Sequence, residues 1–176
     1  MGKNYFKKCV FLTIVLFSLH IVAQEKHETH KPFRISPILS HSYIPAATSH
    51  GNEYFIVPSF GLDLEYWFSH KWGIGFHNDL TLQTFQIKNE SGTETERETP
   101  LIVTVDGLYR FHKGWVLVAG AGIEFEKHEN LKIIRIGLEY EIELGNHWDV
   151  APTILYDFRS GNFGTYSIGI GFGKRF

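Results

Sequence analysis

The sequence predicts an all-β protein, an eight-stranded antiparallel up-and-down transmembrane β-barrel. Eight segments of the 176-residue chain alternate apolar and polar side chains with the two-residue period of a β-strand. Each runs about ten to fourteen residues, enough to cross a bilayer at a tilt. Tight turns alternate with mostly longer polar loops between these segments, as in bacterial transmembrane barrels. Glycines and charges of both signs gather on the polar face, as expected for a narrow interior filled by side chains.

The first 23 residues have the features of a secretory signal peptide. Three lysines precede an apolar run over residues 10–22, and polar residues follow Ala23. The run is shorter than the ~20 residues that a membrane-spanning helix needs. We therefore expect a signal peptide over 1–23, a polar leader over 24–31 and a barrel domain over 32–176.

Composition excludes several classes of site. The single cysteine, Cys9, lies within the expected signal peptide, so the mature chain would have no disulfide and no thiolate metal site. Removal of residues 1–23 leaves 14 Lys and Arg against 19 Asp and Glu, a formal net charge of −5. This balance argues against a nucleic-acid partner. The histidines are scattered without ligand spacing, so we expect no metal and no cofactor.

The alternating segments follow one another through the rest of the chain. The sixth is the clearest: apolar residues from Ile134 to Leu144 alternate with Arg135, Gly137 and three glutamates. The connections 45–53 and 88–99 are expected to be long loops. The expected strands span residues 33–43, 56–68, 72–83, 101–111, 115–126, 134–144, 148–159 and 163–176.

The tight turns share a repeated unit. Three-residue turns over 69–71, 112–114 and 145–147 would place a bulky apolar residue directly across each hairpin from a tryptophan. Such residues at one rim form the aromatic girdle of a membrane barrel. The alternative is a set of tryptophans that close the end of a soluble core. The expected girdle comprises Phe68, Trp72, Phe111, Trp115 and Trp148.

Alternation alone does not show which face lies inside, because a soluble lipocalin-type barrel would turn the same apolar face inward. The glycines on the polar face favour a polar interior, since a narrow barrel needs small side chains there. Turn lengths also set Asp63 opposite His77 and Arg135 opposite Asp157, with Glu124 diagonal to Arg135. We therefore predict an interior charge network of Arg34, Asp63, His77, Asp106, Arg110, Glu124, Arg135, Glu139, Asp157, Arg159 and Arg175.

The last strand carries a resemblance to a known family. Tyr166, Phe172 and the terminal Phe176 share one apolar face. With the signal peptide and eight alternating strands, this pattern resembles small outer-membrane barrels of the OmpA/OmpX type. The Ala23-Gln24 junction resembles that of exported proteins of Bacteroidetes-type bacteria. The resemblance implies an outer-membrane location, extracellular long loops, and recognition of these three residues by the barrel-assembly machinery.

Two patterns raise the possibility of enzymatic chemistry. Glu139, Glu141 and Glu143 are expected beside Glu124 and Glu126 on the neighbouring strand, and clustered carboxylates can act in acid–base catalysis. Neutralisation by interior arginines is the preferred interpretation. Some eight-stranded barrels are lipid A deacylases or palmitoyl transferases. The deacylases resemble a hydrolase with His and Ser two positions apart on one strand, and no histidine here has that spacing.

The sequence thus favours a small, monomeric, non-enzymatic barrel in outer-membrane lipid. By resemblance alone, its role would be envelope structure or surface interaction through the extracellular loops. Three alternatives remain open: a lipid A-modifying enzyme, a narrow conduit for small molecules, and a soluble lipid-binding barrel of the lipocalin type.

Overall fold

The computed structural model describes residues 31–48, 51–88, 94–127, 129–160 and 163–176. The expected signal peptide, its cleavage junction and all of the leader except Lys31 lie outside these residues. Lys31–Phe176 form one compact unit. No helix in the described ranges is long and apolar enough to span a membrane.

Long antiparallel strands build this unit, as the two-residue alternation predicts. Nine of the eleven strands belong to one sheet, and β4 and β5 form a separate hairpin. The strands are β1 (Phe33–Thr48), β2 (Gly51–Trp67), β3 (Trp72–Thr81), β4 (Phe85–Lys88), β5 (Glu94–Arg97), β6 (Leu101–His112), β7 (Trp115–Phe125), β8 (Leu131–Tyr140), β9 (Ile142–Gly145), β10 (Trp148–Arg159) and β11 (Phe163–Arg175).

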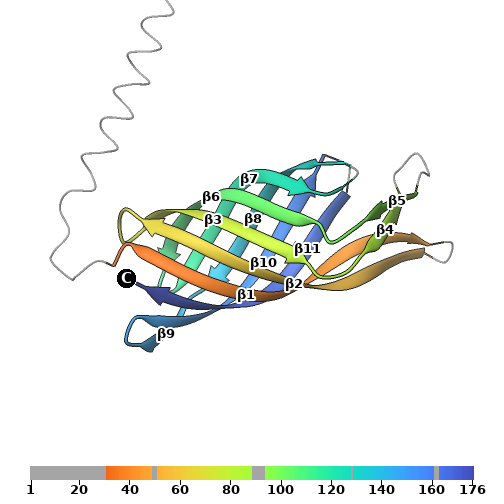
Figure 1. The fold of residues 1–176 in the computed structure, drawn as a ribbon. Helices are drawn as coiled ribbons and strands as arrows, with labels where there is room; N and C mark the ends of the chain where they lie inside the picture. Colours follow the sequence, from red (N-terminus) through yellow and green to blue (C-terminus); the bar gives the residue numbers. More distant parts are fainter. Residues whose placement is uncertain (1–30, 49–50, 89–93, 128, 161–162) are drawn as a thin grey trace, which may run out of the picture. The chain divides into compact units, whose positions relative to one another are not determined.

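The large sheet closes on itself as an eight-stranded barrel (Figure 1). Strands that are neighbours in the chain pair in the order β1-β2-β3-β6-β7-β8-β10-β11, and β11 returns to pair with β1. β9 continues the line of β8 after a break at Glu141, where the Glu141 amide donates to the Gly114 carbonyl at 2.8 Å. The all-β, eight-stranded antiparallel barrel predicted from the sequence is confirmed.

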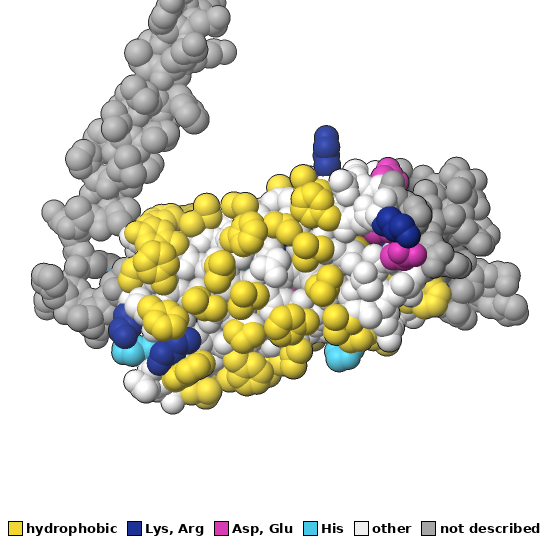
Figure 2. Space-filling model, viewed as in Figure 1, with side chains coloured by type: hydrophobic (Ala, Val, Ile, Leu, Met, Phe, Trp, Pro, Cys, Tyr) yellow, Lys and Arg dark blue, Asp and Glu magenta, His cyan; other side chains and the backbone are white. Residues whose placement is uncertain are grey.

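The apolar face points outward and the polar face points inward. Along β6, for example, Val105 is 53% exposed, whereas its neighbours Thr104 and Asp106 are fully buried. Hydrophobic side chains cover the barrel wall in Figure 2, and charged side chains lie toward the two ends. The orientation predicted from the interior glycines is therefore correct. The lipocalin-type alternative, which needs an apolar interior, is wrong.

We call one end of the barrel the tight-turn end, because it carries the short connections. The first residues of β1 also lie there. The strands keep the predicted register, as in Tyr109 with Leu117 and Ile142 with Val150, but at two hairpins the pair next to the turn differs from the prediction. Two turns contain two residues, 113–114 and 146–147, because Trp115 pairs with His112 and Trp148 with Gly145. The predicted pairings of Trp115 with Phe111 and of Trp148 with Leu144 are therefore wrong. A bulge beside each turn absorbs the extra residue and shifts the register.

We call the opposite end of the barrel the loop end. More of its residues belong to strands than the sequence predicted. The predicted loop 45–53 is mostly a continuation of β1 and β2, which stay paired up to Thr48 and Gly51. The predicted loop 88–99 contains all of β5 and the last residue of β4, and these two strands form a hairpin in which Phe85 pairs with Arg97. Polar composition suggested loops here, but antiparallel pairing of the two strands satisfies their backbone groups.

Candidate functional site: the charged barrel interior

The interior of the barrel, its lumen, contains buried acidic and basic side chains in three layers. The alternation of each strand sends these polar residues inward while their apolar neighbours face outward. The layers are a turn-end layer (Arg34, Glu65, Arg110, Glu139, Glu141, Asp149 and Arg175), a middle layer (Asp63, His77, Asp79, Asp106, Arg135 and Asp157) and a loop-end layer (Arg97, Glu124, Glu126 and Arg159).

Arg34 is the centre of the turn-end layer and contacts three carboxylates. Its Nε lies 3.1 Å from both oxygens of Asp149, and its Nη2 donates to Asp149 Oδ1 at 2.6 Å. Its Nη1 donates to Glu65 Oε1. The same Nη1 lies 2.8 Å from Glu139 Oε1 without hydrogen-bond alignment, so that contact is an ion pair only. One guanidinium thereby joins β1, β2, β8 and β10.

Trp67 closes the lumen at the tight-turn end. Its indole Nε1 donates to Glu65 Oε2 at 2.6 Å, and it packs with the buried Leu108 and Val116. The Arg110 guanidinium lies 4.2 Å from the centroid of the indole ring, a cation–π contact. The prediction missed Trp67, although its position between the outward Tyr66 and Phe68 already placed it on the inner face.

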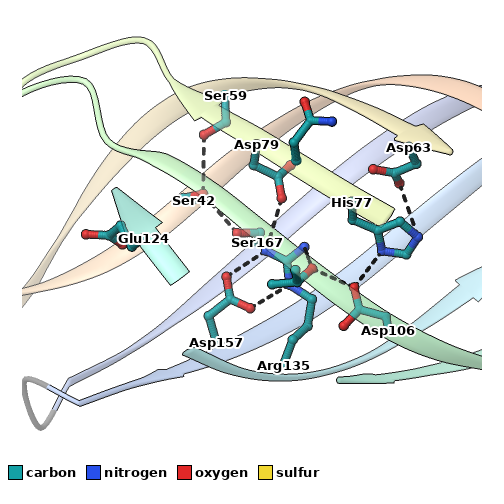
Figure 3. A network of polar contacts seen from close by, with 12 residues as sticks. Ser42, Ser59, Asp63, His77, Asp79, Asp106, Glu124, Arg135, Asp157 and Ser167 are labelled. Carbon is teal, nitrogen blue, oxygen red and sulfur yellow. Dashed lines mark hydrogen bonds and ion pairs between the residues drawn. The ribbon is translucent and has the colours of Figure 1, made fainter. Parts of the chain in front are cut away.

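The middle layer is organised around Arg135 (Figure 3). Arg135 donates to both oxygens of Asp157, at 2.7 and 2.9 Å, and its Nη2 lies 3.0 Å from Asp79 Oδ2. Thr104 Oγ1 donates to Asp106 Oδ2 at 2.6 Å, and His77 Nδ1 lies 2.9 Å from the same oxygen. Asp63 Oδ2 lies 4.0 Å from His77 Nε2 and is the fourth carboxylate around Arg135 and His77, so the middle layer holds more acidic than basic groups.

The loop-end layer ties a connection to the barrel wall. Arg159 donates to Glu124 Oε2 at 2.5 Å, and Arg97 of β5 donates to Glu124 Oε1. Arg97 Nη1 also lies 3.9 Å from Glu126. Sequence reasoning did not include Arg97, because it placed this residue in a solvated loop. A buried apolar cluster of Ile44, Val57 and Phe85, with Phe163 packed against it, lies at the same end of the barrel.

Interior glycines leave room for the charged side chains of neighbouring strands. A Cβ on Gly120 would lie 2.6 Å from Asp106 Cα and still closer to the Asp106 carboxylate. A Cβ on Gly173 would collide with the Arg34–Asp149 pair. Such approaches are shorter than real Cβ contacts, so a side chain at either position would force its neighbours to move.

Some predicted interior pairings hold and others do not. Arg135 pairs with Asp157, and His77 Nε2 lies 4.0 Å from Asp63 Oδ2. The predicted diagonal of Glu124 with Arg135 is wrong. Glu124 pairs across the sheet with Leu131, whereas Arg135 pairs with Gly120, four residues away from Glu124.

The predicted row of adjacent carboxylates is also wrong. Glu139 pairs across β7 with Val116, near the tight-turn end, whereas Glu124 lies near the loop end of the same strand. Because β7 and β8 are antiparallel and are joined at the loop end, Glu124 lies beside the start of β8, whereas Glu139 lies beside the start of β7. Glu143 is exposed and lies outside the network. The two groups of carboxylates are therefore neutralised by different arginines.

Among the described residues, the buried serines and His77 do not form a serine–histidine pair. Ser42 Oγ bonds with Ser167 Oγ at 2.8 Å and lies 3.4 Å from Ser59 Oγ. His77 Nε2 has no hydrogen-bond partner in the described part of the chain, so it activates no serine there. The same part contains no group of three or more His, Cys, Asp or Glu side chains placed to hold a metal ion.

The expected girdle residues lie on the outer wall near the tight-turn end. Phe68, Trp72, Phe111, Trp115 and Trp148 are all exposed there. Trp72 stacks against Tyr109 with ring centroids 4.4 Å apart, and Trp115 against Tyr140 at 4.8 Å.

A second aromatic row, which the prediction missed, crosses the outer wall toward the loop end. Tyr156 pairs with Tyr166, which pairs with Tyr43, so the row spans β10, β11 and β1. The Tyr156 and Tyr166 rings lie 4.6 Å apart. The expected assembly residues Tyr166, Phe172 and Phe176 also face outward, and the Phe176 amide donates to the Phe33 carbonyl at 2.9 Å.

Solved structures share this architecture. The attachment invasion locus protein Ail of Yersinia pestis is 13% identical and has a TM-score of 0.57, covering 84% of this chain and 100% of its own. The N-terminal barrel domain of Pseudomonas aeruginosa OprF is 10% identical (TM-score 0.52; 81% and 97% covered). The outer membrane protein OprG from the same organism is 14% identical (TM-score 0.51; 84% and 97% covered).

Sequence comparison gives no relative: no protein-family model matches the chain, and a search of curated proteins finds no match. At the identities above, the structural likeness establishes the fold and not the activity. The chain has the fold of the small eight-stranded outer-membrane β-barrels.

Proposed function

We propose that this chain is a monomeric, non-enzymatic barrel of the outer membrane, with a role in envelope structure or in surface interaction through its loop-end hairpins. The observation that carries the proposal is a burial pattern opposite to that of a soluble protein. Large apolar residues cover the outer wall while Arg34, Asp106 and Arg135 are buried. Monomeric soluble proteins do not expose an apolar surface of this extent, whereas a lipid bilayer covers it.

The two aromatic rows support a membrane-spanning position. Trp148 and Tyr156 lie eight residues apart on β10, about 26 Å along a strand at ~3.3 Å per residue. At the ~40° tilt of membrane barrels this separation gives roughly 20 Å of height, close to the ~25 Å apolar band of outer-membrane barrels. Aromatic side chains concentrate at both interfaces of such a band.

The filled lumen supports a protein that neither conducts nor catalyses. Trp67 lies at the tight-turn end, Arg135 and its carboxylates fill the middle, and Phe85 packs with Ile44 and Val57 at the loop end. Eight-stranded barrels leave room for side chains but for no wide channel. Planar-bilayer conductance clearly above baseline would favour the narrow conduit, and altered lipid A masses in cells expressing the chain would favour the enzyme.

The loop-end hairpins are the proposed contact surface. Tyr54 and Phe55 on β2 are 54% and 43% exposed, beyond the second aromatic row. A second Ail structure is a complex with the heparin analogue sucrose octasulfate. Residues 88–99 of this chain contain four glutamates and two basic residues. This acidic segment does not favour a sulfated polyanion, so we propose a neutral or apolar partner surface.

Assembly at the membrane would use the last strand. Phe172 of β11 and Phe176, which follows it, are exposed, and we propose that the barrel-assembly machinery recognises them with Tyr166. Replacing Phe176 with Ser should reduce the amount of assembled barrel without changing the stability of the protein that does assemble. Heat-modifiable mobility on gels measures the assembled fraction.

The tryptophans allow a direct test of the membrane orientation. Trp72, Trp115 and Trp148 lie on the outer wall, whereas Trp67 is 1% exposed inside the lumen. Four single-tryptophan variants, with the other tryptophans replaced by Phe, would be reconstituted in vesicles of brominated lipid. We expect strong quenching for the three outer tryptophans and little for Trp67. Equal quenching at all four sites, or a chain that stays monodisperse without detergent, would refute the proposal.

A further inference from the structure

We propose that the outer wall binds one anionic phospholipid at the tight-turn end, with an acyl chain in a groove across β1, β2 and β3 and the phosphate at Lys71 and Lys113. This inference rests on the proposed membrane location. It adds a specific lipid site to a surface that would otherwise contact lipids without preference.

The groove lies between two rows of outward side chains. Pairing across the strands sets Phe33 beside Tyr66 and Tyr66 beside Ile74 in the first row. It sets Ile35 beside Leu64 and Leu64 beside Phe76 in the second row. These six residues line a cavity of about 640 Å³ on the outside of the barrel. Successive outward residues of a strand lie ~7 Å apart, a spacing that admits a single hydrocarbon chain.

The floor and ends of the groove also suit an acyl chain. Arg34 and Glu65 lie beneath the groove, but their side chains turn into the lumen and pair there. Phe176 closes the groove beside β1. At β6 the first row ends in Gly107, the partner of Ile74, so that side has no wall and the groove stays open. A lipid chain can therefore enter from the bilayer without displacing a side chain.

Basic residues border this groove at the membrane interface. The turns 68–71 and 113–114 carry Lys71 and Lys113, both exposed, and contain no acidic residue. The Arg110 amide donates to the Lys71 carbonyl at 2.8 Å, so the β2–β3 turn lies against β6 just before Lys113. Lys71 precedes Ile74 by three residues, about 10 Å of strand. A phosphate between the two lysines would thus lie within reach of a chain in the groove.

The β9–β10 hairpin of the same rim lacks these features. It carries the exposed Glu143, and Lys174 of β11, which pairs with Ile35 at the edge of the groove, is already engaged with the Asn146 carbonyl at 2.7 Å and the Trp148 ring. The difference between these turns selects Lys71 and Lys113 for an anionic headgroup, because lysines near an interface attract anionic lipids.

Native mass spectrometry of the folded barrel released from detergent tests the site. The probes are phosphatidylglycerol and phosphatidylcholine with identical acyl chains. We expect one phosphatidylglycerol to be retained in preference to phosphatidylcholine. The double variant K71Q/K113Q should lose this preference by roughly fivefold for each lysine. The control K132Q, an exposed lysine at the other end of the barrel, should keep it.

A second pair of variants tests the groove. Val105→Trp fills the β6 end of the groove and should reduce retention of both lipids. Its control, Ile134→Trp, lies in the same cross-strand row, since Val105 pairs with Ala121 and Ala121 with Ile134. If V105W lost its heat-modifiable band, Val105→Phe would replace it.

Equal retention of the two lipids, or equal losses in a variant and its control, would overturn the inference. Failure of the membrane location itself would appear differently, as a wild-type chain that is soluble without detergent and shows no brominated-lipid quenching.

Discussion

Arg135 and Asp157 form a two-pronged ion pair inside the barrel, in which Nε and Nη2 donate to the two carboxylate oxygens at 2.7 and 2.9 Å. Arg135 on β8 and Asp157 on β10 are direct cross-strand partners. The pairing of the two strands therefore places the guanidinium and the carboxylate together, and a slip in register would separate them.

Replacement of Arg135 with Gln should destabilise the barrel strongly. The substitution leaves Asp79 without its cation and Asp157 with only Arg159, whose Nη2 lies 4.0 Å away. Breaking a buried ion pair typically costs about 3–5 kcal/mol. Unfolding by urea in lipid vesicles, followed by gel mobility, measures the change. Lys132→Gln on the same strand, exposed to solvent, is the control and should lie within about 0.5 kcal/mol of wild type. An unchanged midpoint for R135Q would show that the network contributes no stability.

Replacement of Asp79 with Asn should behave differently. The middle layer holds four carboxylates around Arg135 and His77, and the Asp79 side chain, at 13% exposure, is the most exposed of the four. Removing one of several repelling charges should leave the unfolding free energy within about 1 kcal/mol of wild type or raise it. Asp157→Asn, which breaks the two-pronged pair, should lower it clearly. Equal losses in D79N and D157N would contradict the excess of negative charge in this layer.

Alanine at Gly120 should destabilise the barrel by about 1–3 kcal/mol, the usual range for overpacking. Its Cβ would collide with the Asp106 carboxylate and with the carbonyl of Val105. Gly107 is the matched control, because a Cβ there meets only the Ala119 carbonyl, at 3.6 Å on the outer wall. Gly107→Ala should be neutral or slightly stabilising. The same urea assay compares the two, and equal effects would refute the packing role of Gly120.

Replacement of Arg97 with Gln should loosen the β4–β5 hairpin while the barrel remains intact. The buried Arg97 links this hairpin to Glu124 and Glu126. We expect amide hydrogen exchange in β4 and β5 to accelerate by at least about tenfold, the equivalent of ~1.4 kcal/mol of local stability. Exchange in β6 and β7 should not change.

The control for this variant is Lys127→Gln. The pair of Lys127 with Glu98, at 3.4 Å, is exposed to solvent and should contribute little. An R97Q hairpin with wild-type exchange would show that Arg97 does not hold it.

Alternation in the sequence was sufficient for the barrel and for the direction of its faces, because strand side chains alternate with a fixed period of two. Alternation did not predict which residues pair next to the tight turns. These pairings depend on backbone conformations such as the positive φ of Gly114, Asn146 and His147, which composition does not determine. The shift of one residue beside two turns moved Phe111 and Leu144 out of their predicted pairings.

The sequence indicated which charged residues lie in the interior better than it indicated which of them pair with each other. Pairs fixed by one short turn or one direct strand pairing, such as Arg135 with Asp157, follow from counting residues. The pairing of Glu124 does not follow in this way, because its partners are Arg97 of the β4–β5 hairpin and Arg159 of β10, which is not adjacent to β7. Trp67 was overlooked although its place in the alternation indicated it, since tryptophans were expected only at the rim.

The closure of β1 on β11 has a consequence for biogenesis. It joins positions far apart in the chain, such as Arg34 and Arg175, so the cylinder cannot seal until the last strand has been delivered. Until then both edges would offer unpaired backbone groups to other chains. Truncations that remove β11 should therefore leave both strand edges open and yield chains that cells degrade instead of shortened barrels.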